Sequence, residues 1–198
     1  MPASKLPVVA TLLDGEDKGA IQDLIHLLPD GDVVLVDVGS FQGGSTFTML
    51  EARSDLPYRL YAVDIWANKD VYQTCMRNFT LFPHIYPFKM PSLEAVTYFQ
   101  DNSVDFIFID ASHAYSDVFA DIQAWLPKCK VGRIVAGHDC EKKYTEYNEQ
   151  EQRDIVIHQQ DEGTPFRCHP GVVKALYDIF QDNYEHVKDT RVWWYRKK

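Results

Sequence analysis

Apolar residues follow two alternating patterns along the chain. Short, nearly continuous runs rich in β-branched residues predict buried strands at residues 32–38, 58–66, 84–89, 104–110 and 132–139. Between and around them, apolar residues at helical spacing predict helices at 19–28, 44–53, 69–82, 92–100, 115–127 and 170–181. Ser92 is the expected cap of the helix at 92–100. Two β-rich pieces, 184–188 and 191–197, predict a terminal antiparallel hairpin.

Strands that alternate with helices indicate βαβ units, and therefore a parallel sheet covered by helices on both faces. Four of the predicted strands end at or near an acidic residue: Asp37, Asp64, Asp110 and Asp139. The carboxyl ends of parallel strands meet at one edge of the sheet, which is where ligands bind in open α/β folds. We therefore expect these four acids to surround a ligand site.

Residues 141–169 interrupt the pattern with a polar stretch that is long for a connection. Because this stretch follows the fifth strand, we expect a lid-like insertion over the ligand edge within a single domain spanning 1–198. A solvated insertion is the alternative. From this segment, His158 and His169 are within reach of the site.

The charge and composition of the chain argue against some kinds of partner and location. The net charge of −9 argues against a nucleic-acid partner. The four cysteines form no CxxC pair, no signal peptide is evident, and no apolar run reaches the length of a membrane span. A cytoplasmic protein without a membrane partner is expected, and the aromatic hairpin leaves room for a homodimer.

The turn after the first strand has the pattern Asp37-x-Gly39-x-x-x-Gly43-x-Ser45. Gly39 permits a sharp turn, and Gly43 brings the helix start close to a ligand, where free N–H groups favour a carboxylate. Ser45 adds a hydroxyl donor, whereas Asp37 favours a cation. A ligand with both a carboxylate and an ammonium, such as the methionine part of S-adenosylmethionine, fits this loop better than a dinucleotide. A purely steric turn is the alternative.

The second strand supports the same ligand. Asp64 closes that strand, where a carboxylate can accept both hydroxyls of a ribose. Trp66 lies two residues further on and is placed to pack against an adenine ring.

The chain resembles class I S-adenosylmethionine-dependent methyltransferases, and among them the small bacterial enzymes of the macrocin O-methyltransferase and cephalosporin-hydroxylase-like group (methyltransferase 24-like). The resemblance rests on VDVGSFQGGST, YAVDIW, the long NSVDFIFIDASHAYSDVFADIQAWLPKCKVGRIVAGHDC and the terminal HPGVVKAL and WWYRK. It implies a three-layer Rossmann-like fold with seven strands in the order 3-2-1-4-5-7-6, the seventh antiparallel. The chain departs from the family at Gly132-Arg133 and at Cys140. The expected cofactor-binding residues are Asp37, Gly39, Ser40, Phe41, Gly43, Ser45, Asp64, Ile65, Trp66, Ser92, Asp110, Ala111 and His113.

The reacting end of the site is expected at the fourth and fifth strands. Asp110 and Asp139 end adjacent strands, and two close carboxylates favour a proton or a cation between them. Related metal-dependent enzymes hold Mg²⁺ at these strand ends and bind the substrate hydroxyl to it, although they commonly carry two acidic or amide residues where this chain has only Asp139. In a metal-free mechanism, His113 or His138 is the general base, with Asp110 beside them.

The sequence thus predicts an S-adenosylmethionine-dependent enzyme that methylates a hydroxyl of a small or sugar-like molecule. A nicotinamide-dependent oxidoreductase is a second hypothesis, but it expects G-x-G-x-x-G after the first strand, and Gly39 is followed by Ser-Phe-Gln. A non-catalytic module that binds S-adenosylmethionine is a third, because fold alone does not separate it from an enzyme.

Overall fold

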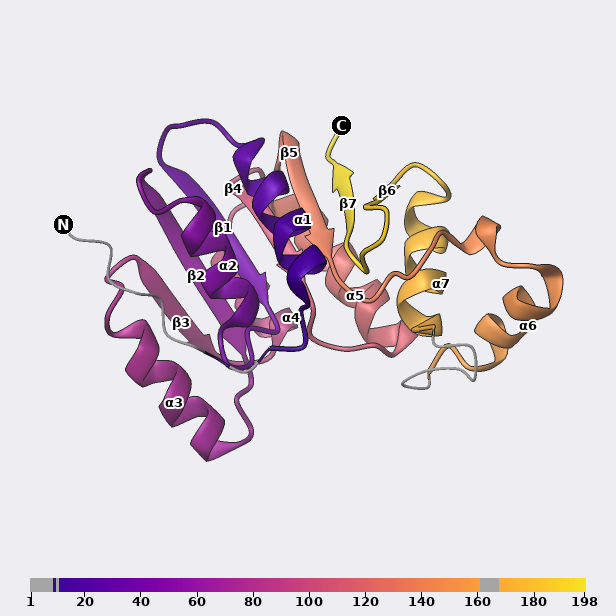
Figure 1. Ribbon diagram of the computed structural model, residues 1–198, viewed down its shortest axis with the longest axis horizontal. Helices are drawn as coiled ribbons and strands as arrows, with labels where there is room; N and C mark the ends of the chain where they lie inside the picture. The colour runs from indigo at the N-terminus through magenta and orange to yellow at the C-terminus, as the bar shows by residue number, and fades with distance from the viewer. Residues whose placement is uncertain (1–8, 10, 161–167) are drawn as a thin grey trace.

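A seven-stranded sheet with helices on both faces forms the centre of the molecule (Figure 1). The computed structural model describes residues 9, 11–160 and 168–198. The strand order is β3-β2-β1-β4-β5-β7-β6, with β7 antiparallel to β5 and to β6. Both the order and the antiparallel strand agree with the prediction. The strands are β1 (Val33–Val38), β2 (Tyr58–Asp64), β3 (Ile85–Lys89), β4 (Val104–Ile109), β5 (Cys129–Gly137), β6 (Glu185–His186) and β7 (Trp193–Arg196).

Two separate cores lie on the two faces of the sheet. Along β1 the side chains alternate between them: Leu35 packs with one helical layer, whereas Val36 and Val38 pack with the other. All six residues of β1 and of β4 are buried, as expected for central strands covered on both faces. The helices are α1 (Gly15–His26), α2 (Gly44–Ala52) and α3 (Lys69–Phe79) on one face, and α4 (Ser92–Ala95), α5 (Tyr115–Trp125) and α7 (Pro170–Phe180) on the other.

The start of α1 differs from the sequence prediction. The helix begins at Gly15 because Asp14 caps it: the Asp14 carboxylate accepts a hydrogen bond from the Asp17 backbone N–H at 2.8 Å, and Asp17 bonds back to the Asp14 N–H. Asp17 nevertheless has a fully buried side chain. An acid in the first turn of an amphipathic helix normally suggests a solvated position, so its burial calls for a partner elsewhere.

The predicted cap at Ser92 is wrong. The cap residue of α4 is Pro91, which has no side chain able to accept a hydrogen bond. The Ser92 hydroxyl instead accepts a hydrogen bond at 2.8 Å from the indole N–H of Trp125, which is fully buried in α5. A serine before an apolar run thus serves tertiary packing here. After α4 the chain continues as a 3₁₀ turn over Val96–Tyr98.

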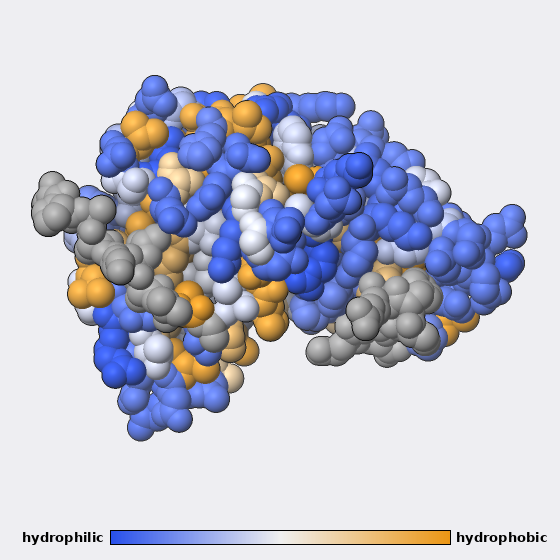
Figure 2. Space-filling view, viewed as in Figure 1, coloured by the Kyte–Doolittle hydropathy of each residue, from blue (hydrophilic) through white to orange (hydrophobic). Residues whose placement is uncertain are grey.

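The polar segment at 141–169 contains regular structure. It holds a 3₁₀ turn at Tyr144–Glu146 and the helix α6 (Glu149–Ile157), which is capped by Asn148 and contacts α7. Residues 161–167 of the predicted lid lie outside the described residues. Figure 1 shows α6 on the outer side of α7, and the surface over both helices in Figure 2 is mostly hydrophilic. The lid role stays a prediction.

Within the part of the chain that the structure describes, no helix combines the length and apolar character needed to cross a membrane.

Candidate functional site

Two adjoining cavities open at the carboxyl edge of the sheet. The β2 cavity has a volume of about 350 Å³ and lies against the connection from β2 to α3. The β5 cavity has a volume of about 300 Å³ and extends towards the end of β5. Their walls share Gly39, Phe41, Asp64 and Ala111, so one elongated ligand can occupy both.

Asp64 stands where the two cavities meet. Its carboxylate accepts hydrogen bonds from the backbone N–H of Phe41 at 2.8 Å and of Trp66 at 2.6 Å, one on each oxygen. Each oxygen of a carboxylate has a second lone pair, so two further donors such as ribose hydroxyls can be accommodated. The two backbone bonds therefore hold the carboxylate in place for a ligand.

Trp66 is among the residues that line the β2 cavity, but its burial argues against the predicted stacking of its ring on adenine. The residue is 2% exposed, its indole N–H donates to the Phe41 carbonyl at 2.6 Å, and its ring packs near Tyr72 and Phe79. Its role is to hold the loop. Phe41 and Ile65, which line the β2 cavity and are 48% and 59% exposed, supply the apolar surface instead.

Gly39 and Gly43 allow the loop to pack closely against neighbouring protein atoms, more than they allow a ligand to approach the backbone. A Cβ on Gly39 would lie 2.2 Å from the Asp110 carbonyl oxygen, and a Cβ on Gly43 would lie 2.9 Å from the Phe47 ring. Both have positive φ, and Gly43 is the cap residue of α2. Gly39 borders both cavities, but Gly43 borders neither, so the structure gives no support to its predicted contact with the cofactor.

Asp37 is fully buried beneath the loop. Its carboxylate accepts hydrogen bonds from the hydroxyls of Ser45, at 2.8 and 2.9 Å, and of Thr46, while Ser40 donates to its backbone carbonyl at 3.1 Å. Asp37 lines neither cavity, so it acts through its neighbours. Ser45 lines the β5 cavity, but its proton points to Asp37, so it presents an acceptor there and not the predicted donor.

Burial raises the pKa of Asp37 to about 6, despite the opposing hydrogen bonds from Thr46 and Ser45. The folded protein therefore holds this proton more tightly than the unfolded chain, and Asp37 reduces stability as pH rises from about 4 through 6. Replacing Asp37 by asparagine is expected to stabilise the ligand-free protein by about 1–3 kcal/mol at pH 7.5. The gain should shrink as the pH falls below 6, when the wild-type carboxyl is protonated.

Urea unfolding of both proteins at pH 7.5 and pH 5 measures this difference. Asp32→Asn is the control, because Asp32 forms an exposed ion pair with Arg59 and its replacement should change stability by less than about 0.5 kcal/mol. A gain that is independent of pH, or a loss at pH 7.5, would show that the hydroxyls around Asp37 compensate fully for its burial.

His138 lies between carboxylates at the far end of the β5 cavity. Its Nε2 is 2.9 Å from the Asp17 carboxylate, and its Nδ1 is 3.2 Å from Asp139 and 3.9 Å from Asp110. Burial lowers the pKa of this imidazole, but the hydrogen bonds to Asp139 and Asp17 outweigh burial and raise the pKa to about 10. An imidazolium cannot accept a proton, so this raised pKa argues against the predicted general base role of His138.

The acids around this ring differ from one another. Burial opposes the ionisation of Asp17 and Asp139, but hydrogen bonds from His138 to Asp17, and from His113 and His138 to Asp139, hold both pKa values far below the usual range. Burial raises the pKa of Asp110 to about 7, with His138 opposing and Asp139 adding to the shift. Asp110 lines the β5 cavity and is the acid of this group poised near neutral pH.

The pair Asp110 and Asp139 does not fit Mg²⁺ as predicted. Ligand atoms of Asp110, His138 and Asp139 lie within 4.8 Å of one another, but the His138 ring takes the place between the carboxylates that a bridging cation requires. Magnesium prefers oxygen ligands, and here an imidazole bonded to a second carboxylate stands in its place.

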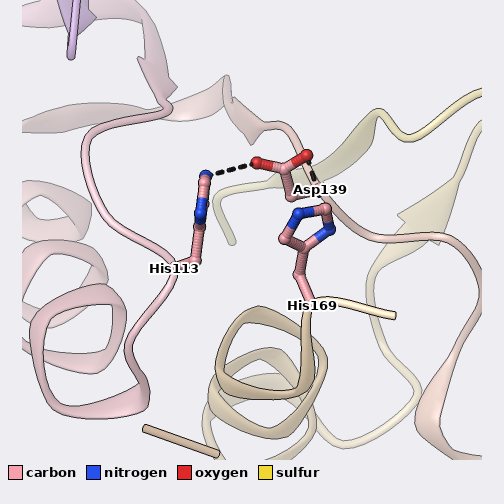
Figure 3. A group of neighbouring side chains, drawn as sticks. All are labelled: His113, Asp139 and His169. Atoms are coloured by element: carbon pink, nitrogen blue, oxygen red, sulfur yellow. Dashed lines mark ion pairs between the residues drawn. The ribbon is translucent and has the colours of Figure 1, made fainter. Parts of the chain in front are cut away.

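A second group gathers on the other side of Asp139. Figure 3 shows His113, from the connection after β4, and His169, at the start of α7, both directed towards the Asp139 carboxylate. His113 Nε2 is 2.8 Å and His169 Nδ1 is 3.5 Å from its oxygens. All three residues line the β5 cavity. Of the described residues at 141–169, His169 alone reaches this cavity.

Sequence reasoning missed several residues at this end. Arg191, from the β6–β7 connection, bonds Asp139 at 3.4 Å and Asp17 at 3.3 Å, and Glu141 bonds His169. Thr11 packs against Gly44, where a Cβ would lie 2.3 Å from its hydroxyl oxygen. These contacts join distant parts of the chain, and only the His169 position carried a signal in the sequence.

Comparisons with known proteins identify the family of this domain. A family model described as a methyltransferase domain matches residues 36–140, the span from β1 to the end of β5. An uncharacterised protein, y4gI, of Sinorhizobium fredii is 29% identical over 131 residues, which cover 60% of this chain and 14% of that protein. The chain thus matches only a small part of its relative.

Two solved structures share the fold at low identity. A protein from Corynebacterium glutamicum is 12% identical with a TM-score of 0.67, over 98% of this chain and 84% of that one. A putative caffeoyl-CoA O-methyltransferase from Staphylococcus aureus is 16% identical with a TM-score of 0.64, over 96% and 84% of the two chains.

Proposed function

Because the chain belongs to the methyltransferase-domain family and has the fold of S-adenosylmethionine-dependent methyltransferases, we propose that it methylates a hydroxyl group of a small molecule. The observation that carries the proposal is the continuity of the two cavities. A site suited to a nucleoside, around Asp64, runs directly into a site rich in proton-accepting groups, around Asp110 and His113.

The cofactor fits with its adenosine in the β2 cavity and its methionine part in the β5 cavity. Phe41 and Ile65 offer apolar surface to the adenine, and Asp64 accepts the ribose hydroxyls. Ser45, whose own proton is held by Asp37, accepts a hydrogen bond from the ammonium group. This arrangement brings the methyl group towards Asp110.

Activation of the acceptor falls to Asp110 or His113. Methyl transfer needs an oxygen that is losing its proton while it is aligned with the methyl carbon. Both side chains line the β5 cavity, and Asp139 orients His113 through a 2.8 Å contact. Within about 300 Å³, shared with the methionine part, the acceptor is small, which favours a compact or sugar-like hydroxyl over a polymer.

Calorimetry of the full chain with S-adenosylhomocysteine and with NAD tests the cofactor. We expect a single site for S-adenosylhomocysteine with a dissociation constant below about 100 μM and no heat from NAD; on general binding arithmetic this corresponds to more than about 5.5 kcal/mol. Binding of NAD alone would favour the oxidoreductase. Binding of S-adenosylhomocysteine without methyl transfer to any of a panel of phenols, catechols and sugars would favour a non-catalytic module.

A further inference from the structure

A buried acid lies behind the wall of the β2 cavity. Asp121, on α5, is 5% exposed, and its carboxylate accepts a hydrogen bond from the hydroxyl of Ser92, at the start of α4. Burial raises the pKa of Asp121 to about 6, although the bond from Ser92 opposes this shift. The charged neighbour that acts on the carboxylate is Asp117, which is another acid. The burial of Asp121 is therefore costly, and the methyl transfer proposed above makes no use of this residue.

Ser92 has a second partner on the same helix. The indole N–H of Trp125, which is fully buried, donates to the Ser92 hydroxyl oxygen at 2.8 Å. A hydroxyl has one proton to donate and two lone pairs, an ionised carboxylate only accepts, and an indole N–H only donates. With a pKa of about 6, Asp121 is largely ionised at pH 7.5. The Ser92 proton therefore points to Asp121, and Trp125 occupies one of the two lone pairs.

Ser92 also lines the β2 cavity, to which Asp64 and Asn68 contribute further polar side chains. Because the proton and one lone pair of the Ser92 hydroxyl are already used, its remaining lone pair is what it can present to a ligand. The cavity therefore contains a hydrogen-bond acceptor that does not become a donor while Asp121 is ionised.

We propose that Asp121 is a positioning residue: by holding the proton of Ser92, it gives the β2 cavity a fixed acceptor that selects adenine over 6-oxo purines. This inference rests on the proposed function, which places the adenine of the cofactor in this cavity. The 6-amino group of adenine donates hydrogen bonds, whereas the 6-oxo group of hypoxanthine accepts them. A site built to hydrogen-bond one group of its ligand rejects an analogue that lacks the group, because its own polar atom is then left unpaired.

The carboxylate is what makes the acceptor selective. A serine hydroxyl beside apolar groups rotates and can either donate or accept, so it would bind both kinds of purine. Asp121 removes this choice, because its carboxylate has no proton to give and takes the one that Ser92 carries. The proposal thus gives a reason for an acid in a position where burial opposes its charge.

Calorimetry of the wild-type full chain at pH 7.5 with three ligands tests the fixed acceptor. The ligands are S-adenosylhomocysteine, its analogue without a substituent at purine position 6, and its 6-oxo analogue, S-inosylhomocysteine. We expect affinity to fall in that order, with the 6-oxo analogue at least about tenfold weaker than S-adenosylhomocysteine, because two acceptors then face each other. A hydroxyl free to rotate would instead bind the 6-oxo analogue at least as well as the unsubstituted one.

Asp121→Leu tests the positioning role. Leucine fills a similar space but accepts no hydrogen bond, so the Ser92 proton is free to turn towards the ligand. The variant should bind S-inosylhomocysteine more tightly than the wild type does, and the affinity ratio between the two homocysteine ligands should fall below about threefold. A purely structural role for Asp121 would weaken both ligands together and leave the ratio unchanged.

Two further variants locate the effect. Ser92→Ala removes the acceptor itself and should also bring the ratio below about threefold, mainly by weaker binding of S-adenosylhomocysteine. Asp117→Leu makes the same change at an exposed acid of α5, which bonds Ser112, and should keep the wild-type ratio. Circular dichroism shows whether each variant is folded. If Asp121→Leu does not fold, the order of the three ligands on the wild-type protein still decides.

The outcomes separate this inference from the proposed function. Binding of S-adenosylhomocysteine without discrimination against the 6-oxo analogue would overturn the inference alone. The same holds for a wild-type ratio in Asp121→Leu or Ser92→Ala, because another group would then read the base. If S-adenosylhomocysteine did not bind at all, the proposed function and this inference would both be lost.

Discussion

Replacing Gly39 by alanine is expected to destabilise the protein by more than about 4 kcal/mol, a large share of the about 5–15 kcal/mol that keeps a typical protein folded. The added Cβ would lie 2.2 Å from the Asp110 carbonyl oxygen and 2.7 Å from the Ala111 Cα, and all its near neighbours are backbone atoms. These atoms directly follow β4, which pairs with β1 and β5. In addition, φ of +93° is strained for any residue with a side chain.

Substitutions at two other glycines distinguish the cost of a steric clash from the cost of a strained backbone. Gly132 has φ of +79° with nothing within 4 Å, so Gly132→Ala should cost only the strain, about 1–2 kcal/mol. Gly15 has open space and lies at the start of α1, so Gly15→Ala should be neutral or stabilise by up to about 1 kcal/mol. Urea unfolding compares the three. Equal losses for Gly39 and Gly132 would show that β1 and β4 can separate at the site.

Replacing Asp64 by alanine is expected to weaken S-adenosylhomocysteine binding by at least about 100-fold, because hydrogen bonds to a charged group contribute about 1.5–3 kcal/mol each. The substitution removes the acceptor for two ribose hydroxyls and frees the backbone N–H groups of Phe41 and Trp66. Asp64→Asn keeps one acceptor oxygen and should lose less. Calorimetry measures all three proteins.

A ligand that lacks one ribose hydroxyl shows whether loss of the ribose hydrogen bonds causes the weaker binding of Asp64→Ala. The wild-type protein should bind the 2′-deoxy analogue of S-adenosylhomocysteine at least about tenfold more weakly than the parent, and Asp64→Ala should bind both alike. Asp70→Ala, an exposed acid in the first turn of α3, is the control and should bind normally. If Asp64→Ala still discriminated between the two ligands, another residue would hold the sugar.

The sheet could be predicted from the sequence because each strand is encoded by a short, continuous run of residues. Buried strands appear as apolar runs, and the rule that parallel strands end at one edge then brings Asp64, Asp110 and Asp139 together without any knowledge of packing. The order of the strands and the antiparallel β7 followed from a family resemblance carried by long segments. These features depend on many residues at once, so single exceptions do not disturb them.

Single side chains were harder to predict, because their partners are distant in sequence. Ser92 has the local pattern of a helix cap but bonds Trp125, and Trp66 follows the predicted ribose-binding acid Asp64 but is held by Phe41. The charge of His138 depends on Asp17, which lies 121 residues away in a position typical of an exposed acid. Short polar residues serve local and tertiary partners equally well, and the chain alone does not say which prevails.

The contacts around His138 also set an order in which the site can be completed. Asp17 bonds both His138 and the backbone N–H of Arg191, a separation of 174 residues in the second case. The walls of the β2 cavity come from residues between Val38 and Ala111, so this cavity does not need the C-terminal part of the chain. During synthesis, the proposed nucleoside site can therefore assemble first, whereas the proposed acceptor site must wait until nearly the whole polypeptide has been made.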